Sequence, residues 1–424
     1  LRNRLQRINE TRVVEEERAS RGWKAYTPPP IALPSASDAP RWNQFDSDHV
    51  SGIFIGAMGM DRVNWLDQDD NSRSQVGNLN NFDGGEVRAL RFGAVGRIKF
   101  DRPWVWTLFL ASNAFDKGID VEDIDDFRVY DARLDIPLTG DLTLSVGKQK
   151  EPISMERLMS LQYLPMQERP AFLDALLPAR KVGAALSGAF LDERVTWAGG
   201  VYNSWLDKDN GGGIDDNPTS FTTRFTWMPF ESRNRTTTLH LGSAFRYSNT
   251  RGGGAIAETP EFIEAPVFVE TPLLDTDSLQ QLQAEASYRT GPWFFHSEYL
   301  GSSLEGTAFG NLDFKGYQLT GAWTLTGEVR PYHHRTGSFD RLPVAKGVDL
   351  GGWGTLELAT RFSHLDLSDG GLDGGEMDIW SLGFNWWLTS NASLGVNYRY
   401  IELDRFGIKG ESHGLNGRLM LQID

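Results

Sequence analysis

The chain has 424 residues, 45 glycines, no cysteine and a formal net charge of −15. It contains no run of about 18 apolar residues, which excludes an ordinary membrane-spanning helix. A transmembrane β-barrel is still allowed, because each spanning strand needs only about 9–11 residues and alternates apolar with polar side chains. The lack of thiols is consistent with an exported protein.

The first 49 residues lack strand patterns. Residues 1–25 are predicted to form a short periplasmic helix, because Leu1, Leu5 and Ile8 recur at helical spacing; it is either the end of a coiled coil or an isolated amphipathic helix. The proline-rich segment 26–49 is predicted to be an extended linker, since proline fixes φ and lacks an N–H donor. No signal peptide is visible at Leu1, so a barrel requires that a leader is removed before this numbering begins.

The first clear strand pattern covers residues 86–100 and 104–112, which alternate apolar and polar side chains around a tight break at 101–103. Successive side chains of a strand point to opposite faces, so Leu90 and Arg91 lie on different sides. One face suits lipid or a core and the other suits water and anions. The pattern predicts two strands joined by a turn.

The same alternation recurs in sixteen runs, which predicts an all-β chain whose residues 50–424 form a 16-stranded antiparallel transmembrane β-barrel. The runs are 50–60, 86–100, 104–112, 127–136, 141–150, 180–191, 195–204, 221–228, 236–249, 278–289, 293–304, 312–325, 352–367, 376–388, 392–402 and 412–423. Tight turns alternate with mostly long loops, as in bacterial outer-membrane proteins. The connection 326–351 is long although it falls on the tight-turn side.

Acidic residues concentrate in the predicted long loops, including 61–85, 113–126 and 250–277. These acids are expected either to be solvated or to bind lipid headgroups, including lipopolysaccharide, through divalent cations. Aromatic residues at strand ends, such as Trp293 and Phe295, are typical of a membrane interface. We therefore expect a location in the bacterial outer membrane.

The polar strand face carries the candidate pore-lining residues. Its cations are Arg91, Arg97, Lys99, Arg133, Arg224, Arg246, Arg361, Arg399 and Arg418, and its acids are Asp131, Asp135, Glu285, Glu298 and Glu357. Guanidinium groups suit carboxylate and phosphate oxygens, so the modest cationic excess favours anions. The alternative is that these arginines pair with the acids and brace the wall.

One stretch is more specific than these patterns. It reads Gly147-Lys148-Gln149-Lys150-Glu151-Pro152, then Glu168-Arg169, then Pro178-Ala179-Arg180-Lys181-Val182-Gly183. The stretch resembles the phosphate-selective porin O and P family, and the blocks Gly337-Ser338-Phe339 and Leu356-Glu357-Leu358 support the resemblance. The similarity covers about residues 50–424. It implies an outer-membrane porin, a homotrimer, and loops folded into the pore, with 326–351 as one such insertion.

The sequence departs from that family in two ways. The chain ends at Asp424, whereas outer-membrane barrels commonly end with an aromatic residue, so either the last strand is recognised differently or the native chain extends further. The dense series of lumenal arginines and lysines that phosphate selectivity requires is not evident when faces are counted.

If the loop 151–179 folds into the barrel, a set of charged residues gathers at a constriction. The set is Lys148, Lys150, Glu156, Arg157, Glu168, Arg169, Arg180 and Lys181, with Glu151 and Asp174 among the opposing acids. Opposed acids and bases there would orient small polar solutes. The alternative is that Glu156 and Arg157 only pin the loop.

The function predicted from these observations is a passive diffusion channel for small polar or anionic solutes, phosphate among them. The alternative is a structural envelope protein whose N-terminal segment binds cell wall or a partner. No catalytic motif such as Gly-x-Ser-x-Gly or His-Glu-x-x-His is present, and no enzyme activity, cofactor or nucleic-acid partner is expected. No metal site is predicted either, since the His333-His334 pair suits a solvated turn or a loop hydrogen bond.

Overall fold

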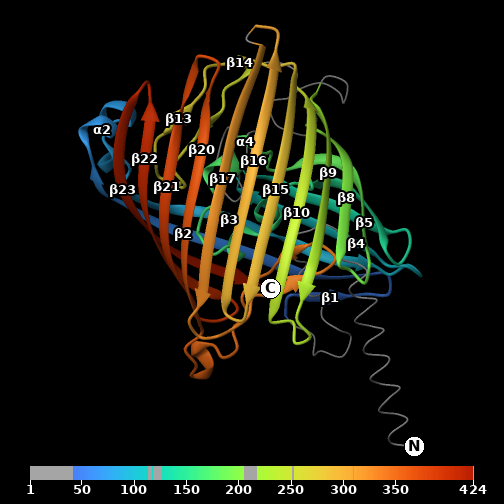
Figure 1. The fold of residues 1–424 in the computed structure, drawn as a ribbon. Helices are drawn as coiled ribbons and strands as arrows, with labels where there is room; N and C mark the ends of the chain where they lie inside the picture. Colours follow the sequence, from blue (N-terminus) through green and yellow to red (C-terminus); the bar gives the residue numbers. More distant parts are fainter. Residues whose placement is uncertain are drawn as a thin grey trace, which may run out of the picture.

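In the computed structural model, residues 42–112, 117, 127–204, 217–250, 253–308 and 310–423 are described. Sixteen antiparallel strands form one closed sheet, because β23 pairs with β2 from Gly56↔Ile423 to Gln68↔Ser412. Figure 1 shows the blue strand β2 and the dark red strand β23 in the same wall. The strands are β2 (Val50–Gln68), β3 (Gly84–Ile98), β4 (Trp104–Ser112), β5 (Phe127–Pro137), β6 (Leu142–Gln149), β7 (Lys181–Phe190), β8 (Val195–Asn203), β9 (Thr219–Glu231), β10 (Thr237–Asn249), β15 (Ser278–Thr290), β16 (Trp293–Gly306), β17 (Gly310–Thr324), β20 (Thr355–Asp369), β21 (Leu372–Trp387), β22 (Ala392–Arg405) and β23 (Ile408–Ile423).

The 16-stranded antiparallel barrel predicted from the sequence is confirmed. Every predicted run overlaps one observed strand, and the tight turns fall on one side of the barrel, the periplasmic side by the outer-membrane pattern. The outer loops after β16, β20 and β22 are shorter than predicted. In each case the two flanking strands stay paired almost to the turn. The predicted N-terminal helix lies outside the described residues. The end of the predicted linker forms β1 (Gln44–Asp46), which pairs with β2.

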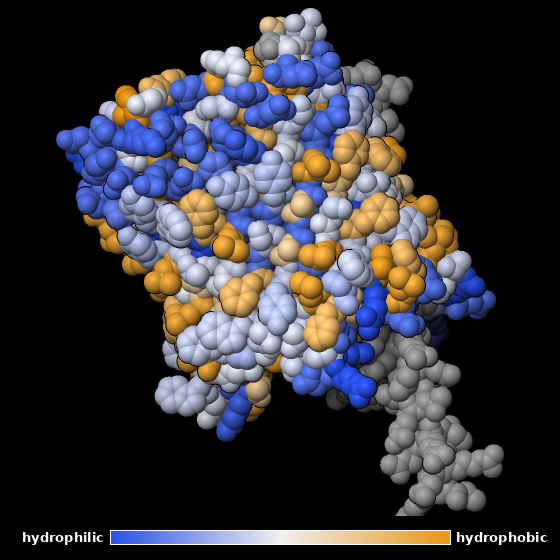
Figure 2. Space-filling view, viewed as in Figure 1, coloured by the Kyte–Doolittle hydropathy of each residue, from blue (hydrophilic) through white to orange (hydrophobic). Residues whose placement is uncertain are grey.

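The two faces of the wall differ as the alternation predicts. In β21, Trp380, Leu382 and Phe384 are exposed on the outside, whereas Ser381 and Asn385 are buried on the inside. Figure 2 shows apolar residues over the middle and lower wall, below a hydrophilic region at the upper left. The outer face therefore presents apolar side chains to lipid, and polar groups gather inside.

Short elements lie between the strands. They are α2 (Asp70–Val76), η1 (Leu79–Phe82), α3 (Met155–Leu158), η3 (Leu161–Tyr163), α4 (Ala171–Leu176), β11 (Gly253–Gly254), β12 (Ala257–Glu258), β13 (Val269–Glu270), β14 (Leu274–Asp275), β18 (Tyr332–His333), β19 (Ser338–Phe339) and η5 (Val348–Leu350). Within the described part of the chain, no helix has the length and apolar character needed to cross a bilayer.

Loops fill much of the barrel interior. Phe172 and Leu173 from the loop after β6, and Phe262 and Phe268 from the loop after β10, join one buried apolar cluster with wall residues such as Leu300. The expectation that the acidic loop 250–277 is solvated or bound to lipid headgroups is thus wrong for its inner part, where Glu258 and Glu261 are buried. Apolar side chains of the same loop draw these carboxylates inward, and lumenal cations compensate them.

Candidate functional site

The loop 151–179 lies inside the barrel, as Figure 1 shows for α4. Almost all of its residues are buried, including its charged side chains. It carries α3, η3 and α4, and it contacts β15 and β3, which lie on opposite sides of the lumen. This is the position that a constriction requires.

Wall carboxylates hold one end of the loop. The backbone N–H of Met155 donates to Glu285 at 2.8 Å, and the N–H of Glu156 donates to Glu298 at 2.8 Å. These amides lie in the first turn of α3, where helix N–H groups have no partner within the helix. Glu285 and Glu298 therefore dock the loop against β15 and β16.

Glu168 attaches the loop to the opposite wall. Its carboxylate accepts from Arg88 on β3 at 2.8 Å and also from Arg418 on β23. Arg418 pairs in turn with Asp61 on β2 at 2.7 Å. Burial alone would raise the pKa of Glu168, but the two guanidiniums outweigh it and hold the pKa far below its usual range.

The centre of the loop contacts a further buried arginine, Arg361. Glu156 lies 3.4 Å from Arg361 and accepts from Gln318. Burial raises the pKa of Glu156, and Arg361 opposes that shift only in part. Arg361 also binds Glu261, which comes from the loop after β10, and Arg399 lies 3.8 Å from the same carboxylate. The two loops thus share the wall arginine Arg361.

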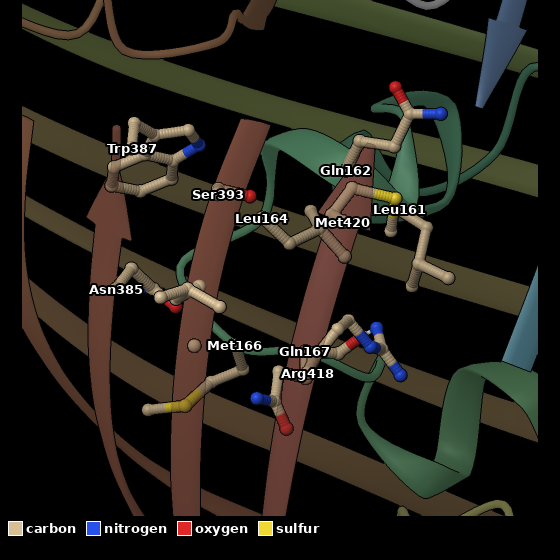
Figure 3. A pocket seen from close by; sticks show the side chains of 12 residues that line it. Leu161, Gln162, Leu164, Met166, Gln167, Asn385, Trp387, Ser393, Arg418 and Met420 are labelled. Carbon is tan, nitrogen blue, oxygen red and sulfur yellow. Dashed lines mark hydrogen bonds between the residues drawn. The ribbon is translucent and has the colours of Figure 1, made fainter. Parts of the chain in front are cut away.

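Figure 3 shows where the loop meets β21–β23. The side chain of Asn385 donates to the carbonyl of Pro165 at 2.7 Å, and the N–H of Gln167 donates to Asn397 at 2.9 Å. A small cavity lies between the loop and this wall. Met166, Gln167, Asn385 and Arg418 are among the residues that line it. The loop is therefore hydrogen-bonded to this wall as well.

Three cations of the predicted constriction set bind the loop's own backbone. Lys150 donates to the carbonyl of Met159 at 3.0 Å, and Arg169 donates to the same carbonyl at 2.9 Å. Arg157 donates to the carbonyls of Leu173 and Leu177 and lies 3.1 Å from Asp174. Burial raises the pKa of Asp174 to about 6, despite the nearby guanidinium of Arg157. These contacts match the alternative in which the cations pin the loop.

The remaining cations of that set lie at its edges. Arg180 pairs with Asp131 at 2.9 Å and stacks over Tyr130, and Lys181 donates to Ser204 at 2.7 Å. Strand register places Lys148 beside Ala132 and Val182, on the face opposite that of Arg133. Lys148 is thus half-buried on the wall and away from the loop.

The predicted pore-lining residues fall into two groups. Arg133, Arg224, Arg246, Arg361 and Arg399 are buried, and carboxylates lie within ion-pair distance of each. Arg91 and Arg97 share the inward face of β3 with Val95 and are only half-buried. Lys99 follows β3 and pairs with Asp46 at 2.5 Å. The first group braces the interior, and the second retains contact with solvent.

Two important residues escaped the sequence analysis. Arg88 faces inward because the register between β2 and β3 shifts there, with Gly59 opposite Ala89 and Met60 opposite Val87. Such a bulge breaks the period of two on which face assignment relies. Glu261 reaches the lumen from a long loop with no periodic pattern.

The long periplasmic connection also enters the barrel. Arg330 pairs with Glu357 at 2.7 Å, Phe339 packs on Phe294 with ring centroids 4.8 Å apart, and Arg224 donates to the carbonyl of Gly337 at 2.8 Å. This segment carries β18 and β19. The lumen is therefore narrowed from the periplasmic side as well as by the loop 151–179.

Histidines and acids meet at a few places. His333 pairs with Asp340 at 2.7 Å and His334 with Glu231 at 3.0 Å. In the described part of the chain, one trio has potential metal-ligand atoms within 4.8 Å of one another: His364, Glu376 and Asp378. His364 and Asp378 already share a contact of 2.8 Å, so a hydrogen bond accounts for that pair.

The sequence profile of the phosphate-selective porin O and P family matches residues 60–423, nearly the whole barrel. The chain belongs to this family. It is thus a bacterial outer-membrane porin by family and by fold. The inserted loop and the paired lumenal charges described above are the features through which this porin narrows its interior.

One relative is similar in sequence, and two solved structures are similar in fold. A Caulobacter vibrioides protein described as uncharacterized is 26% identical over 333 residues, which are 75% of this chain and 63% of the relative. The porin thus spans less than two thirds of that relative. OmpT of Vibrio cholerae is 10% identical with a TM-score of 0.55, over 90% of this chain and all of that one. An anion-selective porin from Comamonas acidovorans is 10% identical with a TM-score of 0.54, over 88% of this chain and all of that one.

We expect Gly316→Ala to loosen the loop. A Cβ at Gly316 would lie 2.1 Å from the Cβ of Phe172, so α4 must move away from β17. Overpacking of this kind costs about 1–3 kcal/mol. Hydrogen exchange in residues 168–177 should accelerate about tenfold, while the barrel strands stay protected. Gly321→Ala is the control, since its nearest neighbour is 3.6 Å away. Unchanged exchange in Gly316→Ala would contradict the docking described here.

We expect Glu168→Gln to destabilise the protein in a pH-dependent way. Breaking the buried pair should lower the free energy of unfolding by about 3–5 kcal/mol at pH 7. A carboxyl whose folded pKa is depressed stabilises the fold above its unfolded pKa, near 4.5, and loses that contribution as pH falls toward the folded value. The difference in urea midpoint should therefore narrow below pH 4.5. Asp101→Asn, in an exposed turn, is the control. A constant difference from pH 7 to 3 would refute the ion-pair assignment.

Proposed function

We propose that this porin is a passive outer-membrane channel for small polar or anionic solutes, with a weak preference for anions and with phosphate among the candidates. The observation that carries the proposal is the loop 151–179, which is docked inside a closed barrel by contacts to opposite walls. A docked loop narrows a lumen without requiring a moving part. Passage is then set by width and by fixed charge. The proposal includes no catalytic step.

The inner face of β3 supports a solute path on that side of the lumen. Arg91 stacks on Phe109 at 4.1 Å and is half-buried, as is Arg97. By contrast, Arg224, Arg361 and Arg399 are almost inaccessible. A cation that keeps solvent contact acts on a passing ion more strongly than a buried one. Arg91 and Arg97 are therefore the proposed pore-lining cations.

Charge neutralisation supports a weak rather than a strict anion preference. The buried pairs Arg133–Asp135, Arg224–Glu285 and Arg246–Glu151 hold three of the lumenal guanidiniums at 2.8 Å or closer to a carboxylate. Each pair contributes little net potential at a distance. The solute therefore experiences a few cations, and the chain lacks a continuous basic surface among its described residues.

The uneven height of the wall supports a homotrimer. Strands β4–β8 have 8–11 residues, whereas the other barrel strands have 13–19. A low wall exposes less apolar surface to lipid and is suited to packing against a second barrel. A solved OmpT from Vibrio cholerae, 12% identical to this chain, is described as a trimer form. The remaining apolar wall is proposed to contact outer-membrane lipids and lipopolysaccharide.

We expect purified protein to conduct ions across planar bilayers, both as the full chain and after deletion of residues 1–40. The barrel and its loops lie outside the deleted segment, so conductance should not change measurably. The competing function is a structural envelope protein anchored by the barrel. A barrel that inserts, as shown by heat-modifiable migration, yet remains electrically silent would favour that alternative.

We expect Arg91→Gln and Arg97→Gln each to lower the permeability ratio of chloride to potassium about twofold, because each removes one half-exposed positive charge beside the path. Reversal potentials across a salt gradient measure the ratio. Arg62→Gln is the control. It removes the same charge from an exposed position on the outward face of β2, so the permeability ratio should not change. An equal effect of Arg62→Gln, or none from either β3 variant, would place the path elsewhere.

A further inference from the structure

The long periplasmic connection has a second part, residues 343–354, which we call the rim loop. Figure 1 shows it in orange, projecting past the lower end of the barrel wall. It carries η5 and leads directly into β20. The first part of the connection, with β18 and β19, enters the barrel, whereas most residues of the rim loop are exposed. The proposed channel function does not use this loop.

Backbone hydrogen bonds hold the rim loop in one conformation. The N–H of Val348 donates to the carbonyl of Leu388, in the turn after β21, at 2.9 Å. The N–H of Gly354 donates to the carbonyl of Lys346 at 3.1 Å and closes the loop on itself. Gly351 ends η5 in the left-handed conformation that glycine adopts without strain. The side chains of the loop therefore project from fixed positions.

The rim loop exposes three apolar side chains that are close together in the chain. Val348 is 39% exposed, Leu350 is 70% exposed and Trp353 is 78% exposed. Single exposed apolar residues are common, but a group of them marks an interaction surface. The charged residues of the loop are Lys346 and Asp349, so its net charge is zero. Such a surface favours an apolar partner over water.

This group continues the lipid-facing surface of the wall. The Nε1 of Trp386, on the outward face of β21, donates to the carbonyl of Trp353 at 2.7 Å. Trp386 lies opposite Leu356 of β20, and Trp323 and Leu325 are exposed near the same end of β17. Tryptophan is enriched at membrane–water interfaces, because its ring is apolar and its N–H is polar. Trp353 therefore lies beside the interfacial aromatic residues of the wall.

A second copy of the chain suits this surface less well than lipid does. The low wall that we propose for trimer contact comprises β4–β8. From β6 the sheet passes β7, β8, β9, β10, β15, β16 and β17 before it reaches β20, which is half of its circumference. The rim loop adjoins β20 and so lies across the barrel from the proposed trimer contact. Lipid then surrounds the rim at this point.

We propose that the rim loop is an anchor that inserts into the periplasmic leaflet of the outer membrane. Leu350 and Trp353 enter the boundary of the acyl chains, as the apolar face of an interfacial segment does. The exposed Lys346 reaches the phospholipid phosphates, since a lysine can lay its apolar stem on lipid and keep its ammonium in the headgroup layer. The anchor does not require that the barrel conducts.

Site-directed spin labelling tests the anchor, because the chain has no cysteine and one introduced thiol takes the label alone. The full-length Leu350→Cys variant is labelled and placed in nanodiscs of phosphatidylethanolamine and phosphatidylglycerol. Collision rates of the label with oxygen, which concentrates in lipid, and with Ni-EDDA, which stays in water, are then measured. We expect an oxygen-to-nickel ratio about fivefold above that of a label in water, since interfacial segments lie roughly 5–10 Å into the headgroup boundary.

Asp101→Cys is the matched water reference, since Asp101 is exposed in the tight turn after β3 at the same end of the barrel. Leu319→Cys, on the outward face of β17, is the lipid reference. A ratio at Leu350→Cys equal to that at Asp101→Cys would place the rim loop in water and overturn the anchor. Low collision rates with both reagents would indicate burial against a second copy and would also overturn it. Because no current is measured, a barrel that does not conduct would leave this result interpretable.

Discussion

The pairing of β2 with β23 closes the sheet, and closure is the condition under which a β-sheet can reside in a bilayer. Lipid offers no hydrogen bonds to an open strand edge, so every backbone N–H and C=O at membrane depth needs a partner within the sheet. The register from Gly56↔Ile423 to Gln68↔Ser412 provides those partners across the joint between the first and last barrel strands. Once the sheet is closed, one face of every strand must meet lipid and the other must enclose the lumen.

The enclosed face carries many charged groups in a confined space, and buried charges are costly unless opposite charges compensate them. In this porin, carboxylates from inserted loops pair with the wall arginines. Glu168 binds Arg88 and Arg418, Glu261 binds Arg361, and Glu151 binds Arg246. Each contact compensates two charges and also fixes a loop against the wall. The charges that shape the interior are therefore largely the same charges that hold its loops.

The lumenal arginines therefore fall into two kinds: those that hold a loop through a carboxylate, and those that remain accessible to a passing ion. A guanidinium held at a carboxylate contributes to loop position, whereas a half-exposed one such as Arg97 contributes to the potential along the lumen. The number of lumenal arginines is thus a poor guide to ion selectivity in this porin. Their partners and their exposure are the informative quantities, and these differ between β3 and the wall from β9 to β22.

The alternation of apolar and polar residues was enough to locate all sixteen strands, because side chains in a strand point alternately to lipid and lumen whatever their neighbours are. The motif from Gly147 to Gly183 was enough to indicate the family. The same reasoning placed Arg224 and Arg361 on the inner face, where they lie. These features are local, and the sequence specifies them directly.

Only the tertiary structure decided which charges meet. Glu168 lies 80 residues from Arg88 and 250 from Arg418, and no local pattern relates them. The bulge at Arg88 turned toward the lumen a residue that strict alternation with Leu90 would place on the lipid face, because one extra residue reverses the alternation. Loop insertion likewise decided that Arg157 binds carbonyls of its own segment. Long-range pairing depends on how the closed barrel brings distant segments together, and that arrangement is not written in any single stretch of the chain.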